Sequence, residues 1–434
     1  MDKLDILVLS GFPRMWSARL ADDMILALEK AGHHVDFNYP EFDDDLKHAR
    51  ESAEPSLLTR LLIKFRIVKI LNKFGYVFPF QGKQIITNKV NHDFYNVDES
   101  HPLLNPKLVL QRLKCKHYDM IIFLFWVNVF DSTTMKVLYD HFKCPIFNYA
   151  VDMAPMTGGC FYFGDCRRFE NECKGCLSWN GLFRNQAHHN FCVKQKNYDS
   201  IEICTATNTW GKRFVEGSNL FKHISVGSII INDKTFYPKD KASCFLSRMI
   251  SDKKKFVMLA RYTGTETRKG YDYLVKSLNI FCSKITKKEK DSVMLILIGR
   301  EIVRPEHKVD VDTIQLGFVD APTLADAYAF SNVFLCPSTD DGGPSMVNQS
   351  IMCGTPVVAF DSGTAIDVVQ NGVSGYRVPL RDTESFANAI NKLFHTSTEN
   401  FKKMRESTRK IALEWNSPSA FVHQVENVYR LFRG

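Results

Sequence analysis

The chain has 434 residues, which is too long for one compact core, so two domains are expected. Hydrophobic residues make up 45% and charged residues 24% of the sequence, which is typical of a folded globular protein and excludes a disordered chain or a coiled coil. The formal net charge of +8 suits an anionic small molecule or an anionic membrane surface, and it is weak support for a nucleic-acid partner.

No apolar run approaches the roughly 20 residues that a membrane-spanning helix needs. Residues 1–13 lead directly into a strand and have no layout of an export signal, so a cytoplasmic location is expected. The twelve cysteines are then expected to be reduced thiols or metal ligands rather than disulfides.

A strand, a helix and a second strand are predicted at the start of the chain. Residues 4–10 form a short apolar run that ends at Gly11, as buried parallel strands do. Residues 16–31 predict a helix that ends at Gly32, and residues 34–38 predict the next strand. This order indicates a doubly wound sheet in a first domain over residues 1–238. Further strands are expected at residues 120–127, 145–151, 201–208 and 224–231.

An insertion at residues 43–110 interrupts this pattern. Between residues 56 and 90 there are seven basic residues and no acidic one, and Leu, Ile and Phe lie between them. Such a basic amphipathic helix can lie on an anionic bilayer, which would make the protein peripheral at the inner face of the membrane. It can equally pack on the domain with a solvated basic face, so both interpretations remain open.

The βα pattern restarts after a polar segment at residues 240–255. Strands are expected at residues 256–260, 293–298, 313–316 and 333–337, and helices at residues 271–281, 323–330 and 383–394. They predict a second doubly wound domain over residues 239–416, followed by a C-terminal helix at 417–434 that packs back towards the first domain. Two such domains would face each other across a cleft, with a nucleotide on one side and an acceptor on the other.

The stretch at residues 338–376 resembles a phosphate-binding turn. Gly342 and Gly343 allow a close approach of the backbone, and Pro344 is tolerated in the first turn of a helix. The start of that helix would direct N–H groups and a positive dipole end at an anion. The alternative is an ordinary strand–turn–helix unit.

Two cations flank a loop earlier in the second domain. Arg261 follows a strand and Lys269 precedes the next helix, so the pair could neutralise a leaving diphosphate. The alternative is a solvated basic loop.

Several motifs occur in order through the second domain, namely A-R-Y-x6-K-G from Ala260, L-I-G-R from Leu297, L-G-F-V-D from Leu316, and D-x7-Q-x3-C-G-T-P-V-V from Asp341. Together they resemble the GT-B glycosyltransferases of family GT4. The resemblance covers the second domain nearly end to end, and the layout of the first domain agrees with it.

The resemblance implies a role for each matching residue. Asp341 would contact the hydroxyls of the donor sugar, Gln349 the ribose, and Arg261 and Lys269 the diphosphate. The phosphate-contacting amides would lie in the stretch Gly343, Pro344, Ser345 and Met346, in which Pro344 itself has no N–H, and Gly342 would belong to the same donor site. The base pocket would lie near Gly299, Arg300, Gly317, Phe318 and Val319, and the first-domain loop facing the donor would contain Gly11 and Arg14.

Two positions depart from the family pattern, which has Glu at both. Asp341 keeps the charge with a shorter reach, whereas Gln349 offers one acceptor oxygen and a donor amide. The departures bear on the identity of the donor, a UDP- or GDP-sugar. The resemblance implies retaining transfer with no catalytic metal.

A cysteine-rich loop over residues 157–192 resembles that of a subset of these transferases, with H-D-x-W-x-x-T-G-G-C and three more cysteines. Val151 and Ala154 replace the His and the Trp of that motif, and Asp152 remains. Asp152 either orients an acceptor and polarises its hydroxyl or caps the turn at residues 155–158.

The loop contains Cys160, Cys166, Cys173 and Cys176 within 17 residues. Four thiolates suit a tetrahedral structural Zn²⁺, and one ligand could be replaced by His188, His189 or Cys192. The alternatives are reduced buried thiols or a local disulfide.

These features predict a retaining transferase that moves a hexose-type sugar to a hydroxyl of a glycan or lipid-linked glycan, in the biosynthesis of surface polysaccharide. Gln349 and Val151 leave open a catalytically weak binding module, and a GT-B epimerase or phosphorylase is a further alternative. An NAD dehydrogenase is disfavoured because no G-x-G-x-x-G follows the first strand.

Overall fold

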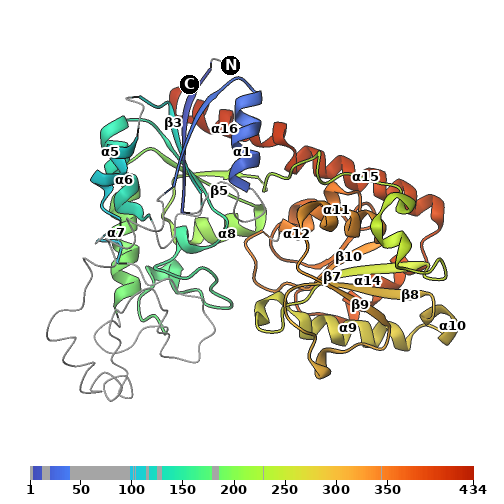
Figure 1. Cartoon of the computed structure of the whole chain (residues 1–434). Helices are drawn as coiled ribbons and strands as arrows, with labels where there is room; N and C mark the ends of the chain where they lie inside the picture. The colour runs from blue at the N-terminus through green and yellow to red at the C-terminus, as the bar shows by residue number, and fades with distance from the viewer. Residues whose placement is uncertain are drawn as a thin grey trace, which may run out of the picture. The chain divides into compact units, whose positions relative to one another are not determined.

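The computed structural model describes residues 3–11, 20–39, 98–100, 102, 104–113, 117–124, 130–177, 185–227, 229–343 and 345–434. Arg14, Pro344 and the basic segment at residues 56–90 lie outside the described residues. The chain forms two compact units (Figure 1). The first comprises Met1–Thr207, Gly211–Val226 and Val422–Gly434, and the second comprises Asn208–Trp210 and Gly227–Phe421.

The first unit is built on a parallel sheet with the strand order β2-β1-β3-β4-β5-β6. Its strands are β1 (Asp5–Ser10), β2 (His34–Asn38), β3 (Met120–Leu124), β4 (Ile146–Tyr149), β5 (Ile203–Thr207) and β6 (His223–Val226). The four central strands are buried almost throughout, as apolar strands between two helix layers must be.

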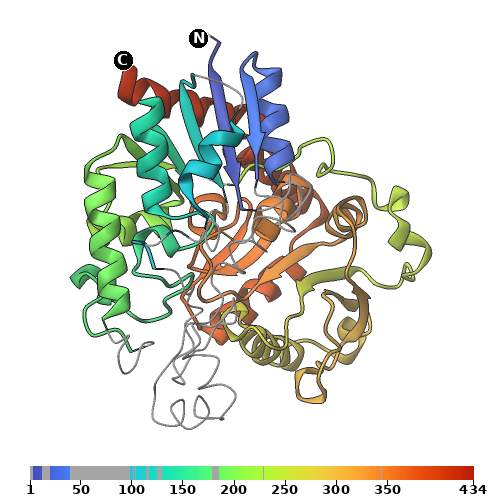
Figure 2. The same cartoon turned by 60° about the vertical axis from the view of Figure 1, so that its left-hand side comes forward.

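Helices cover both faces of this sheet (Figures 1 and 2). On one side lie α1 (Leu20–Lys30) and α16 (Pro418–Arg433), and on the other α6 (Ser132–Phe142) and α7 (Gln186–Asp199). The unit also contains α5 (Pro106–Arg112) and most of α8 (Thr209–Ser218).

The end of the chain contributes to the first unit through α16. The Glu426 carboxylate lies 3.5 Å from His33 Nε2, and Arg433 forms an ion pair of 2.9 Å with Glu202. The helix therefore contacts the residue before β2 and the residue before β5.

The second unit has its own parallel sheet, with the order β12-β11-β10-β7-β8-β9. Its strands are β7 (Phe256–Arg261), β8 (Val293–Ile298), β9 (Asp312–Gly317), β10 (Val333–Cys336), β11 (Val357–Phe360) and β12 (Gly375–Val378). Its helices are α9 (Tyr271–Ser283), α10 (Lys287–Lys290), α11 (Ala321–Phe330), α12 (Ser345–Met352), α13 (Ala365–Val368), α14 (Thr383–Phe394) and α15 (Thr398–Asn416).

Successive residues of β7 point to opposite faces of this sheet. Val257 and Leu259 belong to the core that α11, α12 and α15 cover. Met258 and Ala260 belong to the core beneath α9 and α14. This alternation follows from the two-residue period of a strand and produces one hydrophobic layer on each side.

Two sequence predictions differ from the structure near the change of unit. The strand expected at residues 224–231 ends at Val226, because the apolar residues that follow belong to the second unit, where the Ile231 N–H donates to the Asn416 carbonyl at 2.8 Å. The polar segment at residues 240–255, expected between domains, forms 3₁₀ turns that bury Cys244 and Leu246 in the second core.

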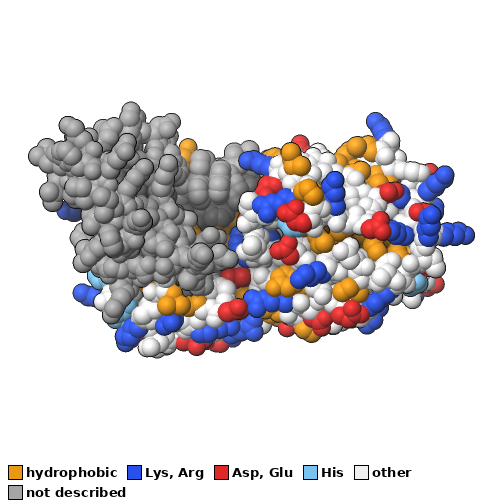
Figure 3. All heavy atoms as spheres, turned by 90° about the horizontal axis from the view of Figure 1, so that it is seen from below, with side chains coloured by type: hydrophobic (Ala, Val, Ile, Leu, Met, Phe, Trp, Pro, Cys, Tyr) orange, Lys and Arg blue, Asp and Glu red, His pale blue; other side chains and the backbone are white. Residues whose placement is uncertain are grey.

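Figure 3 shows Lys and Arg side chains interspersed with Asp and Glu on the described part of one face. A search of the described helices finds none with the length and apolar character needed to cross a bilayer.

Candidate functional site

The second unit gathers its predicted site residues at one edge of its sheet. β10 lies beside β7, and the helices that follow these strands, α12 and α9, pack on opposite faces. The loops therefore diverge at this point, the position where open α/β sheets bind ligands. Arg261 is the last residue of β7, Lys269 ends the 3₁₀ turn Thr267–Lys269, and Asp341 precedes α12.

An ion pair between a half-buried lysine and a buried carboxylate forms where these loops meet. Lys269 Nζ contacts Asp341 Oδ2, and the Arg268 guanidinium lies 3.8 Å from the same oxygen. Only 4% of Asp341 is exposed. Burial alone would raise the pKa of this carboxyl, but Lys269 and Arg268 outweigh burial and hold the pKa below its usual range. The site thus contains a desolvated carboxylate with cations beside it.

The backbone locks the two loops together around this pair. The Thr339 N–H donates to the Arg268 carbonyl at 2.8 Å. Gly270 has a φ of 71°, and a Cβ built there would lie 1.9 Å from the Pro337 carbonyl oxygen. Only glycine fits, both because the backbone is left-handed and because the chains touch. Lys269 is therefore positioned by the loop after β10.

The start of α12 presents polar groups around Asp341. The Gly343 N–H lies 3.4 Å from Asp341 Oδ1, and the Asn208 side-chain amide donates to the Gly342 carbonyl. Ser345 and Met346 form the half-buried first turn of the helix.

Gln349 lies one turn further along α12. Its side chain is buried, and its Oε1 atom has no hydrogen-bond partner among the described residues. Because an unsatisfied buried acceptor costs about 1–3 kcal/mol, such a group usually awaits a ligand or a water molecule.

The predicted base-pocket residues lie at the ends of β8 and β9, at the same edge. The Gly299 N–H donates to the Gly317 carbonyl at 3.0 Å. The Arg300 guanidinium lies 4.3 Å from the centroid of the Phe318 ring, which is 71% exposed. Val319, which follows, packs against the core.

Arg261 faces a different partner from Lys269. Its guanidinium lies 3.7 Å from Glu266 Oε1, and 44% of its side chain is exposed. The structure thus places Arg261 at the same edge as Lys269 but leaves it outside the Asp341 ion pair.

The remaining predicted residues belong to the first unit. Gly11 follows β1, and its N–H donates to the Leu124 carbonyl at 3.2 Å. Asp152 follows β4 and is half-buried, and its Oδ1 accepts a hydrogen bond from the Ala154 N–H at 2.8 Å. Burial raises the pKa of Asp152 to about 6. This contact is the one expected of a turn cap, and an acceptor-binding role stays a prediction.

A buried lysine holds the Asp152 turn from the α7 side. Lys194 Nζ donates to the carbonyl oxygens of Ala154 at 2.7 Å and Thr157 at 2.8 Å. It also lies 3.3 Å from Glu99 Oε1, and both side chains are fully buried.

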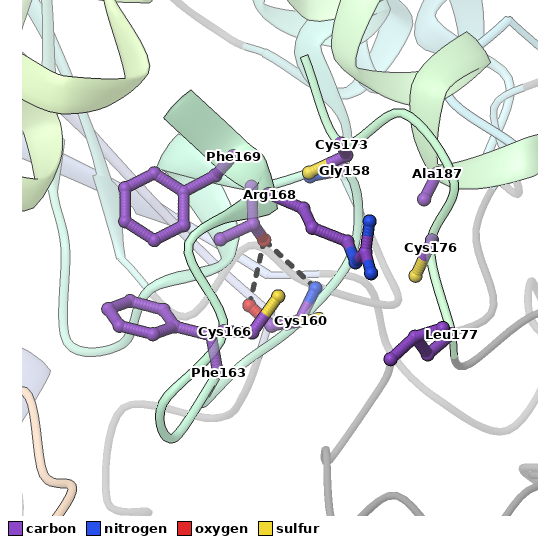
Figure 4. A pocket seen from close by; sticks show the side chains of 11 residues that line it. Gly158, Cys160, Phe163, Cys166, Arg168, Phe169, Cys173, Cys176, Leu177 and Ala187 are labelled. Atoms are coloured by element: carbon purple, nitrogen blue, oxygen red, sulfur yellow. Dashed lines mark hydrogen bonds between the residues drawn. The ribbon is translucent and has the colours of Figure 1, made fainter. Parts of the chain in front are cut away.

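The four cysteines of the loop line one small cavity of about 20 Å³ (Figure 4). All four are thiols rather than disulfides. Burial raises the pKa of Cys173 to about 12, and the neighbouring Cys176 adds to this rise. The set of ligand-type atoms that lie within 4.8 Å of one another in the described chain is a different one, Glu172, His188 and Cys192. His189 instead lies 3.1 Å from Ser100 Oγ.

Sequence reasoning missed Arg268, Asn208 and Lys194. Arg268 adjoins Lys269, so a basic neighbour was the only signal for it. Asn208 ends a predicted strand, where polar side chains often reach a site. Lys194 lies within a polar helix and no local pattern distinguishes it.

Part of the second unit is similar to a known family. Residues 253–396 match the family model described as glycosyl transferases group 1. D-inositol 3-phosphate glycosyltransferase of Rhodococcus erythropolis is 30% identical over 166 residues, which are 31% of this chain and 38% of that protein. The chain spans less than half the length of the curated relatives that it matches, 45% and 38% for two of them.

Solved structures match nearly the whole chain. Sucrose-phosphate synthase from Thermosynechococcus elongatus superimposes with a TM-score of 0.61 and 15% identity over 99% of each chain. Anabaena HepE in complex with UDP-glucose gives 0.57 and 15% identity over 99% of this chain and 100% of that one. The chain therefore has the GT-B fold of two Rossmann-like units, and its residues 253–396 resemble the glycosyl transferases group 1 family.

Proposed function

We propose that this protein is a retaining glycosyltransferase that transfers a sugar from a nucleoside-diphosphate sugar to a hydroxyl of a glycan or lipid-linked glycan, in the biosynthesis of surface polysaccharide. The reaction breaks the bond between the anomeric carbon and the diphosphate and forms a bond to the acceptor oxygen. The nucleoside diphosphate leaves with the electron pair, and the acceptor hydroxyl loses its proton.

The observation that carries this proposal is the ion pair of half-buried Lys269 with buried Asp341 beside α12. A lysine offers only donors and a carboxylate only acceptors. A nucleotide sugar is complementary to both, because its phosphates accept hydrogen bonds and its sugar hydroxyls donate them. When the pair separates to bind a nucleotide sugar, the phosphates replace Asp341 as the acceptors for Lys269. The sugar hydroxyls replace Lys269 as the donors to Asp341. Lys269 then neutralises charge that grows on the leaving diphosphate, with the N–H groups at the start of α12 adding to the effect.

Gln349 supports a ribose contact for the same donor. Its buried Oε1 lacks a partner in the described chain, and a ribose hydroxyl would supply the missing proton. The family match and the UDP-glucose bound by the structural neighbour HepE favour UDP-glucose as the first donor to test. Asp152 in the first unit would accept a hydrogen bond from the acceptor hydroxyl.

A thermal-shift titration with UDP-glucose and GDP-mannose tests donor binding. A donor present at 100 times its Kd is expected to stabilise the chain by about 2.7 kcal/mol. Gln349→Leu should weaken binding by about tenfold, because one hydrogen bond is worth about 1 kcal/mol. Gln370→Leu, at an exposed position, should leave binding unchanged. If neither nucleotide sugar shifts the melting temperature, the donor assignment fails.

The acid limb of the pH–rate profile tests the role of Asp152. The rate with acceptor is expected to fall as the pH drops through about 6, since the carboxylate then becomes protonated. The pKa is raised in the folded chain, so the stability that protonation confers is fully present below the ordinary pKa of 3.8 and is lost as the pH rises through 6. Titration of Asp152 thus does not unfold the protein in the range where the rate falls.

Asp152→Asn should remove this limb and lower the rate at pH 7.5. An unchanged limb in Asp152→Asn would assign it to another group and leave Asp152 as a turn cap.

A further inference from the structure

The four cysteines of the first unit come from separate turns and line one cavity, in which no three of their sulfur atoms lie within 4.8 Å of one another. Cys160 follows the Thr157 turn, Cys166 lies between this turn and the 3₁₀ turn Arg168–Asn171, and Cys173 and Cys176 follow that turn. All four line the same cavity, as Figure 4 shows. A space of about 20 Å³ is close to what one water molecule or one small ion occupies.

The turn that carries Cys173 and Cys176 is held in an unusual backbone conformation. Glu172 and Cys173 have φ values of 53° and 55°, and Gly175 has 63°. Two adjacent non-glycine residues in the left-handed region cost of order 1–3 kcal/mol each and persist only where surrounding contacts fix them. The backbone of this turn is therefore fixed in a conformation that brings Cys173 and Cys176 to the same cavity.

The sulfur atom of Cys173 and the backbone of Cys160 are held by groups outside the turn. The Gly158 N–H donates to Cys173 Sγ at 3.2 Å, a contact that favours a thiolate. The Thr157 hydroxyl accepts the Cys160 N–H at 2.9 Å and in turn donates to the Cys160 carbonyl. Lys194 fixes the Thr157 carbonyl from α7. The segment from Thr157 to Cys160 is therefore anchored to α7 before any ion binds.

The chemistry of the lining selects the ion. No carboxylate or imidazole is among the described side chains that line this cavity, so a hard cation such as Mg²⁺ or Ca²⁺ finds no suitable ligand among them. Soft thiolates prefer Zn²⁺, and four of them fill its tetrahedral shell. We propose that Cys160, Cys166, Cys173 and Cys176 bind one structural Zn²⁺, which fixes the loop between β4 and α7 beside Asp152.

A neighbouring set of ligand-type side chains is the competing site. Glu172, His188 and Cys192 lie within 4.8 Å of one another, each half-buried. Glu172 is already paired with Lys174 at 2.7 Å, and His188 Nδ1 lies 2.9 Å from the Glu172 carbonyl oxygen. These contacts occupy the groups with other protein atoms, so this set is less suited to an ion.

Metal analysis of the full-length protein, purified under reducing conditions, tests the assignment. About one zinc ion per chain is expected, and Cys173→Ser and Cys176→Ser should each lower this to near none. Three matched variants should keep the ion: Cys204→Ser, a buried cysteine of β5 outside the cavity, Arg168→Ala, which lines the cavity without being a ligand, and Cys192→Ser from the competing set. Zinc lost only in Cys192→Ser would move the site to that set.

Two measurements on the unmutated chain keep the proposal testable if the serine variants do not fold. Exchange with Co²⁺ should produce the visible bands and sulfur charge-transfer absorption of a tetrahedral thiolate site. Chelation should expose four additional thiols to a thiol reagent. Zinc-free protein with all its thiols reactive, or a disulfide among the four under these conditions, would overturn the proposal. Neither result bears on donor binding, so this site and the proposed function can fail separately.

Discussion

Replacing Lys269 with Met is expected to lower kcat for sugar transfer by about 100- to 1,000-fold, the loss that follows removal of one preorganised charge-stabilising donor. The methionine keeps the volume of the side chain but cannot neutralise the leaving diphosphate. The donor Kd should rise less than kcat falls, because charge on the diphosphate grows towards the transition state. Steady-state kinetics with the donor identified by thermal shift measures both.

Lys284→Met is the matched control for Lys269→Met. Lys284 pairs with Glu384 on the surface of the same unit, where such pairs contribute about 0–1 kcal/mol. The Lys284→Met variant should transfer sugar at the rate of the unmodified protein. Arg261→Ala should also slow transfer, since Arg261 lies at the same sheet edge. Sugar transfer near the normal rate in both Lys269→Met and Arg261→Ala would refute the diphosphate role of this pair.

The second large effect is expected on the stability of the first unit, when Lys194 is replaced. Lys194→Met is expected to lower the free energy of unfolding of the first unit by about 3–5 kcal/mol, because it leaves the Glu99 carboxylate buried without this cation. It also removes the hydrogen bonds to the carbonyl oxygens of Ala154 and Thr157. Urea unfolding followed by a probe in the first unit measures the change.

Two further variants separate charge from packing. Lys136→Met breaks the exposed pair with Asp140 and should cost about 0.3–0.5 kcal/mol. Adding Glu99→Gln to Lys194→Met should recover part of the loss, since no buried charge then lacks its partner. Equal stability of Lys194→Met and Lys136→Met would show that the buried pair does not stabilise the unit.

The two sheets could be predicted because many of their strands, such as β3 and β8, are continuous apolar runs. β8 and the helix α14 were predicted at their observed bounds. The strand predicted to continue to residue 231 ended early, since apolar character alone does not reveal which of two cores a residue joins. α15 was missed because its buried positions, Met404, Thr408 and Ile411, are separated by charged residues that lower its overall hydrophobicity.

α7 shows a harder limit of sequence reasoning. Its buried face contains Asn190 and Lys194 beside Ala187, Phe191 and Tyr198, so the polar members obscure the helical period. The partner that makes Lys194 tolerable, Glu99, lies far away in the sequence. The resemblance implied that Lys269 and Asp341 contribute to one donor site of the second domain, which stays a prediction. Their direct contact depends on the fit of Gly270 against Pro337, which no local pattern records.

The pairing of Lys269 with Asp341 has a consequence for ligand discrimination. The cation is already occupied by a carboxylate of the same chain, so a simple anion such as sulfate must compete with that carboxylate and leave it desolvated. A neutral sugar meets the opposite difficulty, because it cannot satisfy the lysine. Only a molecule that brings an anion and hydroxyl donors together compensates both partners at once. On the proposed function, the unliganded site therefore binds the intact sugar nucleotide more tightly than it binds either the nucleotide or the sugar alone.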